Sequence, residues 1–419
     1  PSARLLCPSM SQKKSKLFSR LREHQLMGDA EQVVMKVVPR MEEIPAAAWD
    51  ACANPGGDVA DVPFLSHTFL KALEESGSAT ARTGWAPHHL ILEEPDGSLA
   101  GVVPMYMKNH SQGEYVFDYG WADAFERAGG NYYPKLQVSV PFTPATSRRI
   151  LARPGLFQER TEDQLTAGMI ELARQLEVSS VHLTFLPEGQ WSRLGELGFL
   201  QRTDQQFHWL NNDYETFDDF LTALSSRKRK NLRKERERAL ENGIEVEWIT
   251  GSDLTETHWD AFFEFYTDTG MRKWGSPYLT REFFSMIGET MADETLLIMA
   301  KREGHYIAGA LNFVGSETLF GRNWGCIEHH PFLHFEICYY QAIDFAIARG
   351  LKKVEAGAQG AHKLARGYLP THTYSAHYIA NSSFREAVEH YLEQERRHVD
   401  HDIAALSRHA PFRQSGDEN

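Results

Sequence analysis

The same order of predicted helices and strands occurs twice along this chain of 419 residues. In each half, helical patterns precede a run of short apolar segments that have strand length. The helical patterns lie at 67–76, 255–268 and 280–291, and the strand patterns lie at 89–93, 99–108, 296–301, 307–314 and 318–324. A chain of this length can also bury two separate cores. The sequence therefore predicts two copies of one α/β unit.

We place the boundary between these units near 202–215, which gives a first domain at 32–205 and a second at 206–413. Successive strand patterns are joined by short turns, which is typical of antiparallel neighbours. We therefore expect an α/β (α+β) fold with mixed, mostly antiparallel sheets that helices flank. The repeat is one of pattern, because the two halves share no obvious identity.

Residues 1–31 precede the predicted domains and have a distinct composition. They lack an initiator Met and an apolar signal core, and they are basic and free of acidic residues up to Glu23. This composition predicts the remnant of an organellar transit peptide, with a truncated start as the alternative. The four cysteines show no CxxC pairing, which favours a reducing compartment. We expect the interior of a chloroplast or another organelle, and otherwise the cytoplasm.

No apolar run approaches the roughly 18 residues that cross a bilayer, so we expect no integral membrane insertion. The formal net charge of −13 argues against a general nucleic-acid coat. The positive charges nevertheless cluster in a predicted basic helix at 217–242. Its cationic side chains that could pair with phosphate oxygens are Lys228, Arg229, Arg233 and Lys234. The alternative is a solvated helix in which Arg and Glu pair along one face.

The stretch 322–368 carries most of the side chains that could act in catalysis. Its long predicted helix starts at Pro331 and has an apolar face that must belong to the core. Polar side chains crowd the helix start, namely Glu328, His329, His330, His334 and Glu336. The candidate general bases among them are Glu328, His330, His334 and Glu336. His330 and His334 are also spaced for a metal ion, although we expect no metal there. Each histidine could instead be a partly buried structural side chain.

A glycine-rich segment follows the next predicted strand, at 356–368. Small residues let the backbone approach a ligand closely, so the polar side chains here become candidates. We assign His362 to catalysis and Gln359, Lys363 and Arg366 to binding a co-substrate. An ordinary glycine-rich turn into a short helix is the alternative.

The first half has its own polar and aromatic cluster, at 108–144. So many aromatic residues in an irregular loop predict a substrate cleft or packing against the second domain. The candidate substrate-binding residues are His110, Glu114, Tyr115, Asp118, Trp121, Tyr133 and Lys135. A Ser-His-Asp hydrolase is disfavoured, because the sequence has no G-x-S-x-G motif.

Five segments together resemble the FemAB-like family, whose members are described as peptidoglycan biosynthesis/recognition proteins or predicted N-acyltransferases. They are HSQGEYVFDYGWADAF, YYPKLQVSVPFTP, SSRKRKNLRKERERA, YTDTGMRKWGSPYLT and HFEICYYQAIDFAIARGLKKVEAGAQGAHKLARGY. The resemblance covers roughly 62–413. It implies tandem domains of the GNAT (acyl-CoA N-acyltransferase) superfamily. The glycine-rich Q/R-x-x-G-x-G/A loop that binds the donor pyrophosphate in that superfamily is missing here, and Ala361 replaces the glutamate of the family's usual GEHK.

The resemblance implies an N-acyltransferase, which moves an acyl group from a CoA or carrier-protein thioester to a substrate amine. The co-substrate would be acyl-CoA or acyl carrier protein, and the acceptor a small-molecule, lipid or peptide amine. Better-understood relatives instead move an aminoacyl group from tRNA onto a peptidoglycan precursor, so a tRNA-dependent transferase of the FemX type is the first alternative. The second alternative is a noncatalytic protein that binds a glycan or a lipid, which the loss of a carboxylate at Ala361 would fit.

Overall fold

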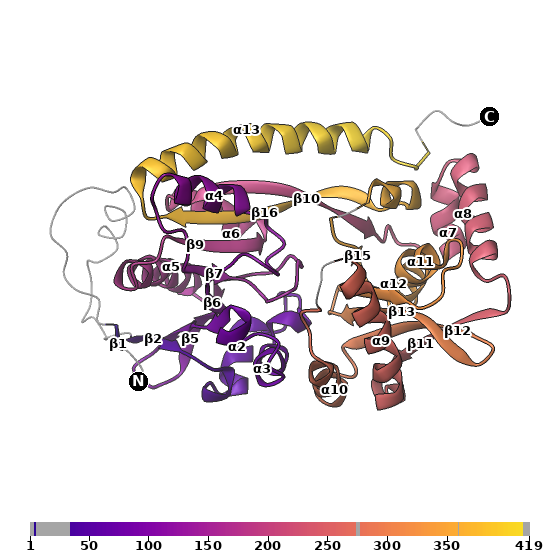
Figure 1. Cartoon of the computed structure of the whole chain (residues 1–419), viewed down its shortest axis with the longest axis horizontal. Helices are drawn as coiled ribbons and strands as arrows, with labels where there is room; N and C mark the ends of the chain where they lie inside the picture. The colour runs from indigo at the N-terminus through magenta and orange to yellow at the C-terminus, as the bar shows by residue number, and fades with distance from the viewer. Residues whose placement is uncertain (1–3, 6–33, 274–276, 359, 414–419) are drawn as a thin grey trace. The chain divides into compact units, whose positions relative to one another are not determined.

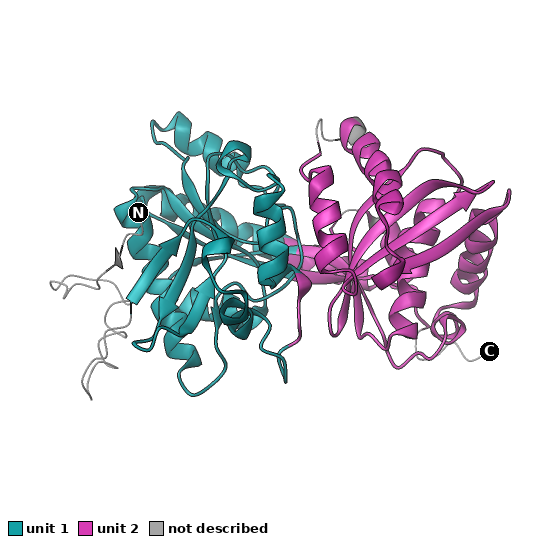
Figure 2. Ribbon diagram, turned by 90° about the horizontal axis from the view of Figure 1, so that it is seen from below, with its two compact units in different colours: residues 1–59, 64–204, 373–398 teal, residues 60–63, 205–372, 399–419 magenta. Residues whose placement is uncertain are grey.

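The computed structural model describes residues 4–5, 34–273, 277–358 and 360–413 (Figure 1). The chain divides into two compact units (Figure 2), with 1–59, 64–204 and 373–398 in unit 1 and 60–63, 205–372 and 399–419 in unit 2. Segment 373–398 thus returns to unit 1, although the sequence pattern assigns it to the second domain. The predicted extension 1–31 lies outside the described residues, except for the short strand β1 (Arg4–Leu5).

Unit 1 contains two groups of strands, within which most neighbours run antiparallel (Figure 1). The first group is β1, β2 (Val34–Val38), β4 (His89–Glu93), β5 (Leu99–Val103) and β8 (Leu151–Ala152). The second is β3 (Trp85–Pro87), β6 (Met105–Lys108), β7 (Lys135–Val138), β9 (Ser180–Leu186) and the unit 1 part of β16 (Leu369–Ile379). Within the second group, β7 and β9 run parallel.

Helices surround these strands in unit 1. They are α2 (Ala46–Ala53), α3 (His67–Glu75), α4 (Tyr119–Arg127), α5 (Gln158–Gln175), α6 (Glu188–Glu196) and the first part of α13 (Ser382–Ser407). Helix α5 buries Leu165, Met169 and Leu172, whose spacing places them on one face against the core of the unit. The sequence pattern had not predicted α13.

Unit 2 is built on strands that pair largely with their neighbours in the chain. In order they are β11 (Ile244–Thr250), β12 (Thr295–Arg302), β13 (His305–Val314), β14 (Thr318–Cys326), β15 (Lys353–Glu355) and the unit 2 part of β10 (Leu200–Leu210). All pairs are antiparallel except β14 with β15. The turn between β12 and β13 contains Glu303 and Gly304, both with positive φ, as a two-residue hairpin requires. These pairings confirm the predicted mixed, mostly antiparallel sheets.

The helices of unit 2 correct the sequence prediction at two places. They are α7 (Phe217–Ala223), α8 (Ser226–Ala239), α9 (Glu256–Lys273), α10 (Arg281–Thr290), α11 (Leu333–Phe335) and α12 (Gln341–Ala348). The predicted basic helix 217–242 is therefore two helices. Leu224 has extended backbone and forms a bridge to Phe412, while the Ser225 N–H donates to the Pro411 carbonyl, so the chain is held out of the helix between them.

The predicted helix after Pro331 also has an interruption. A π-helical turn, Glu336–Tyr340, separates α11 from α12. Such turns are rare and occur frequently at functional sites. This turn contributes Ile337, Tyr339 and Tyr340 to the core of unit 2.

Helix α9 lies very close to β14, and a glycine makes this approach possible. A Cβ atom on Gly325 would lie 2.2 Å from the backbone oxygen of Phe265 in α9. No larger residue fits there without moving the helix. Among the described residues, no helix is both long enough and apolar enough to cross a membrane.

Candidate active site

Strands β14 and β15 of unit 2 separate soon after they begin. They pair in parallel only along Thr318–Phe320. Beyond this point β14 continues along β13 to Cys326. The chain after β15 instead follows β10, because the Ala356 N–H donates to the Phe207 carbonyl at 3.2 Å. From Phe320 onward, β14 therefore has an edge that β15 does not cover.

The uncovered part of β14 also contains an irregularity. In the ladder with β13, Leu311 lies opposite Asn323, whereas Asn312 lies opposite Gly321. Arg322 is thus the extra residue of a β-bulge. Bulges redirect the backbone and are over-represented next to active sites.

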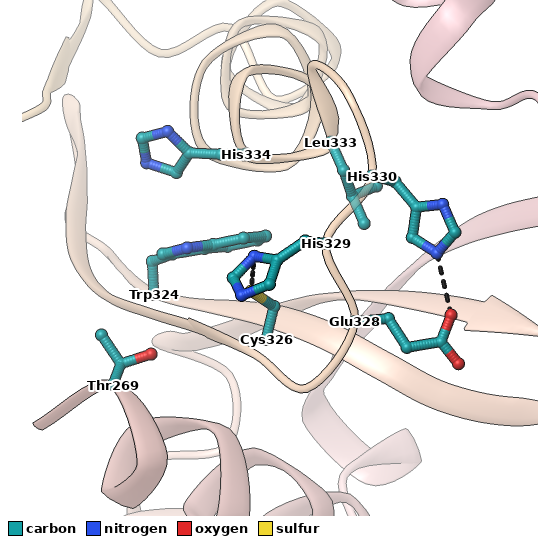
Figure 3. A pocket seen from close by; sticks show the side chains of 8 residues that line it. All are labelled: Thr269, Trp324, Cys326, Glu328, His329, His330, Leu333 and His334. Carbon is teal, nitrogen blue, oxygen red and sulfur yellow. Dashed lines mark hydrogen bonds and ion pairs between the residues drawn. The ribbon is translucent and has the colours of Figure 1, made fainter. Parts of the chain in front are cut away.

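A pocket of ≈ 190 Å³ lies at the end of this strand (Figure 3). Its walls come from α9, from the end of β14, from the turn that follows and from the start of α11. The lining residues are Thr269, Trp324, Cys326, Glu328, His329, His330, Leu333 and His334. Three of the five predicted catalytic residues, namely Glu328, His330 and His334, therefore come together in one pocket.

Glu328 is held by two partners and orients His330. Its carboxylate accepts hydrogen bonds from Arg302 Nε at 2.8 Å and from a terminal nitrogen of Arg302 at 3.0 Å, and it lies 2.8 Å from His330 Nε2. The hydrogen bonds from Arg302, and then that with His330, lower the pKa of Glu328 to about 2. Glu328 is therefore an ionised acceptor and a poor base at neutral pH. It favours the proton of a neutral His330 on Nε2, which leaves Nδ1 as the basic atom.

His334 lies on the opposite side of the pocket from His330 (Figure 3). Its ring centroid lies 5.1 Å from that of Trp324, 5.4 Å from that of Tyr339 and 6.2 Å from that of His362. His334 thus connects the pocket with the glycine-rich segment 356–368. Between the two sides, His329 lies next to Cys326.

His362 belongs to an aromatic and cationic group that adjoins His334. Its Nε2 lies 3.1 Å from the Tyr339 hydroxyl. Burial, followed by the charges of Arg366 and Lys363, lowers the pKa of His362, so the imidazole is neutral at pH 7. Arg366 stacks 3.4 Å above the Phe335 ring and donates to the His362 carbonyl at 2.7 Å. Arg366 is therefore engaged in positioning this segment.

Lys363 is buried at the point where the chain leaves β15. Its ammonium group donates to the carbonyls of Ala356 and Gly357, the latter at 3.0 Å. Burial lowers the pKa of Lys363 to about 8. The predicted binding residue Gln359 lies outside the described residues.

Glu336 lies outside the pocket. It is fully buried and accepts hydrogen bonds from Arg236 of α8, at 2.8 Å for the shortest, and from Gln341 at 2.8 Å. Arg236 also pairs with Asp344 at 2.7 Å. The oxygens of this carboxylate are thus engaged with side chains of the protein itself. The geometry therefore assigns Glu336 to anchoring α8 on the helix that follows the pocket.

The four predicted phosphate-binding cations are all on α8, but they differ in exposure. Lys228 and Arg229 are half-buried, whereas Arg233 and Lys234 are exposed. Arg233 pairs with Asp218 of α7 at 2.9 Å, whereas the alternative prediction has Arg and Glu pairing along the helix itself. Arg238, which the sequence prediction omitted, lies 5.0 Å above the ring of Phe332, the neighbour of the pocket residue Leu333. The end of α8 therefore adjoins the pocket.

In unit 1, three of the predicted substrate-binding residues form a buried ionic network. Lys135 is fully buried and donates to Glu114 and Ser111 at 2.8 Å each and also to Asp118. Burial would raise the pKa of Asp118, but the charge of Lys135 lowers it below the usual range. Tyr132 donates to Asp118 at 2.6 Å. These residues reach no solvent, so they hold the segment 109–134 in place rather than line an open cleft.

A second lysine, Lys108, completes this network. Its ammonium group lies 4.0 Å from Glu114 and 3.7 Å from the Trp85 ring centroid. Burial lowers the pKa of Lys108 to about 7 and raises that of Glu114 to about 7. Behind Tyr132, burial lowers the pKa of His182 to about 3, so this histidine is neutral.

The remaining predicted substrate-binding residues lie around the network. Trp121 is buried beneath the Arg202 guanidinium, which lies 5.2 Å from its ring. Tyr133 is half-buried and its hydroxyl lies 2.8 Å from Ser111 Oγ. His110 is half-buried and its Nε2 lies 3.0 Å from the Thr83 carbonyl, while Tyr115 is half-buried with a φ of 60°. Of the seven predicted substrate-binding residues, three are thus half-buried, namely His110, Tyr115 and Tyr133. The other four are buried.

The sequence prediction did not include the pocket residues Thr269, Trp324 and Cys326. The pattern gave no reason to connect α9 with the end of β14, since Thr269 and Trp324 are 55 positions apart in the sequence. His329 belongs to the polar group that the sequence places at the helix start, although it is not one of the predicted catalytic residues. Among the described residues, no group of three or more His, Cys, Asp and Glu side chains is placed to hold a metal ion.

The sequence profile of the FemAB-like family, described as peptidoglycan biosynthesis/recognition, matches residues 40–414. No curated protein matches the sequence significantly. Among solved structures, FemX superposes with a TM-score of 0.51 at 13% identity, over 83% of this chain and 98% of FemX. This likeness shows that the chain shares its fold with FemX.

Two further structures have lower scores. A tandem GNAT protein from the clavulanic acid biosynthesis pathway has a TM-score of 0.44 at 13% identity, over 83% of this chain and 99% of its own. L-PGS from Bacillus licheniformis has a TM-score of 0.47 at 9% identity, over 84% of this chain and 98% of its own.

Proposed function

The chain belongs to the FemAB-like family, and we propose that it is an N-acyltransferase which moves an acyl group from a CoA or carrier-protein thioester to a substrate amine. The observation that carries this proposal is the divergence of β14 from β15 beside a pocket rich in imidazole groups. A separated strand edge offers backbone N–H groups in an extended row. A reacting carbonyl can bind there as if it were the next strand.

The uncovered edge of β14 suits a carbonyl that develops negative charge. As an amine attacks, the carbonyl oxygen becomes an oxyanion, which backbone N–H groups between Asn323 and Gly325 would stabilise. Such donors are fixed by the strand and need no reorganisation during the reaction. The bulge at Arg322 changes the direction of these groups locally.

His330 is our candidate for the general base. Arg302 holds Glu328, and Glu328 in turn orients the His330 ring at 2.8 Å, so that Nδ1 is the atom available for proton transfer. A base that a third group orients is the arrangement that acyl-transfer sites use repeatedly. His330 would accept the proton that the amine loses as the C–N bond forms.

The donor's phosphate groups have cationic partners within the same unit. Arg238 and the exposed Lys234 lie on α8, whose end adjoins the pocket at Phe332. Guanidinium and ammonium groups at this position could hold the phosphates of CoA while the thioester reaches the pocket. These cations take the place of the glycine-rich loop that the sequence lacks.

The same cations support a second donor. Arg227, Lys230 and Lys234 are exposed on one helix, and a row of this kind fits the closely spaced phosphates of a nucleic acid. An aminoacyl ester of tRNA would place its carbonyl at the same strand edge. The chemistry at His330 would be unchanged.

A comparison of donors tests the proposal. The purified full chain is incubated with a short-chain acyl-CoA or, separately, with a mixture of charged tRNAs, each together with a panel of amines. We expect mass spectrometry to detect a new amide in the acyl-CoA reaction. An amide formed only with charged tRNA would overturn the thioester donor. No amide with either donor would contradict a transferase and favour a noncatalytic binding protein.

A further inference from the structure

Cys326 and His329 form a thiol–imidazole pair on the pocket wall that the reaction proposed above does not use. The sulfur atom lies 3.7 Å from His329 Nδ1, which is within hydrogen-bonding distance for sulfur. Cys326 is the last residue of β14, and His329 follows in the turn that leads to α11. Figure 3 shows the imidazole ring directly above the sulfur, between Trp324 and His330.

The surroundings of this pair are those of a site for a polar ligand group. Thr269 lines the same pocket, and its hydroxyl oxygen is buried without a hydrogen-bond partner among the described residues. A buried hydroxyl of this kind costs free energy unless something pairs with it. A carbonyl oxygen or an amine that enters the pocket would provide this partner.

The thiol–imidazole pair differs from the environment of another cysteine in the chain. Cys52 in unit 1 is buried and its thiol lies 3.7 Å from the Leu99 carbonyl. Burial raises the pKa of this thiol, although Arg153 and Arg148 act in the opposite direction. A thiol next to an imidazole base can become a thiolate, which is the reactive nucleophile. Chemistry at Cys326 therefore has a local proton acceptor.

We propose that Cys326 is a transient acyl acceptor and that His329 is its base, an inference that rests on the proposed acyl transfer. In the first step the Sγ–H proton passes to His329 Nδ1 as Sγ attacks the donor carbonyl. The Sγ–C bond forms and the carbon–sulfur bond to the donor breaks. The departing donor thiolate takes the proton from His329, and the acyl group is left on Cys326 as a thioester.

In the second step the substrate amine attacks this thioester. The C–N bond forms, the C–Sγ bond breaks, and His330 takes the proton that the amine loses. Cys326 leaves as a thiolate and takes up a proton from solvent. His330 then releases to solvent the proton that it took from the amine. The net reaction converts thioester and amine into amide and free thiol, with no oxidant or reductant. The thiol of Cys326 and both bases, His329 and His330, belong to residues that line the same pocket.

Trapping the acylated protein tests this step directly. The full chain is incubated with acetyl-CoA without an amine, quenched in acid and digested for mass spectrometry. We expect an acetyl group on the peptide that contains Cys326, removable by hydroxylamine, and none after Cys326→Ala. We also expect Cys326→Ala to lower amide formation by more than about 100-fold, while the matched variant Cys338→Ala keeps the wild-type rate. Full activity of Cys326→Ala without an adduct would overturn the proposal and leave direct acyl transfer intact.

A second measurement does not depend on acyl transfer. Alkylation by iodoacetamide is followed at each cysteine as a function of pH in the wild type and in His329→Ala. We expect Cys326 in the wild type to react at a lower pH than Cys52, and His329→Ala to remove this difference. If no donor is consumed, the function proposed above fails. The pH dependence of alkylation still shows whether His329 activates the Cys326 thiol. Identical profiles in both proteins would contradict the role of His329.

Discussion

Lys135 shows how one buried charge can hold a segment together. It contacts Glu114, Asp118 and Ser111 and is fully buried. We expect Lys135→Met to lower the free energy of unfolding by about 3–5 kcal/mol, because two carboxylates then lose their buried partner. Urea denaturation of the full chain measures this change. The matched control is Arg174→Met, which removes an exposed pair with Glu171 and should change stability by less than about 1 kcal/mol. Similar losses in both variants would contradict the role of Lys135.

Lys363 should make stability depend on pH. Its pKa in the folded chain is lowered to about 8 by burial, so the unfolded chain binds more protons between that pH and the ordinary lysine pKa of about 10.4. The free energy of unfolding then rises with pH in this window. Below the window it is lower, because Lys363 must be buried with its charge. We expect the wild type to gain about 3 kcal/mol over Lys363→Met between pH 8 and 10.5, measured by urea denaturation. A difference that stays constant with pH would contradict the lowered pKa.

The contact of α9 with β14 is a feature of elements rather than of single side chains. A Cβ on Gly325 would lie 2.2 Å from the Phe265 backbone oxygen, so Gly325→Ala must push α9 away from the strand that leads to the pocket. We expect a loss of about 1–3 kcal/mol in thermal or urea unfolding. Gly189→Ala is the control, since nothing lies within 4 Å of its added carbon, and it should be neutral or slightly stabilising. Equal behaviour of the two variants would rule out the close contact.

Helix α8 offers a test of which donor binds. We expect reversal of Arg227, Lys230 and Lys234 to Glu to weaken binding of the phosphate-bearing donor. If that donor is charged tRNA, the slope of log affinity against log salt should become shallower by about 2. The matched control reverses Arg127, Arg160 and Arg174, three exposed cations of unit 1. Donor binding is measured by fluorescence anisotropy. An equal loss of affinity in both triple variants would contradict a specific role for α8.

At the scale of the whole molecule, the alternation of apolar strand patterns and helical patterns in each half was sufficient to predict mixed, mostly antiparallel sheets that helices flank. The break between α7 and α8 could not be predicted, because it depends on contacts of Leu224 and Ser225 with Phe412 and Pro411, far along the chain. The role of segment 373–398 in unit 1 is likewise a tertiary property.

The candidate site was predictable in part. Glu328, His330 and His334 were found because they crowd one helix start in the sequence. The burial of Glu336 could not be seen there, since its partner Arg236 lies 100 residues away. The same holds for Thr269, which reaches the pocket from α9. Local crowding thus identified the region, and the long-range contacts decided which side chains face the pocket.

The central claim is that an acyl group is transferred to an amine at the uncovered edge of β14, with His330 as base. The most direct measurement is kcat for amide formation by the wild type, His330→Ala and Glu336→Gln, with folding of each checked by circular dichroism. We expect His330→Ala to lower kcat by about 10²–10⁴-fold, because a positioned base is lost. Glu336→Gln should keep most of kcat, since it anchors a helix outside the pocket. An unchanged kcat in His330→Ala would contradict this claim.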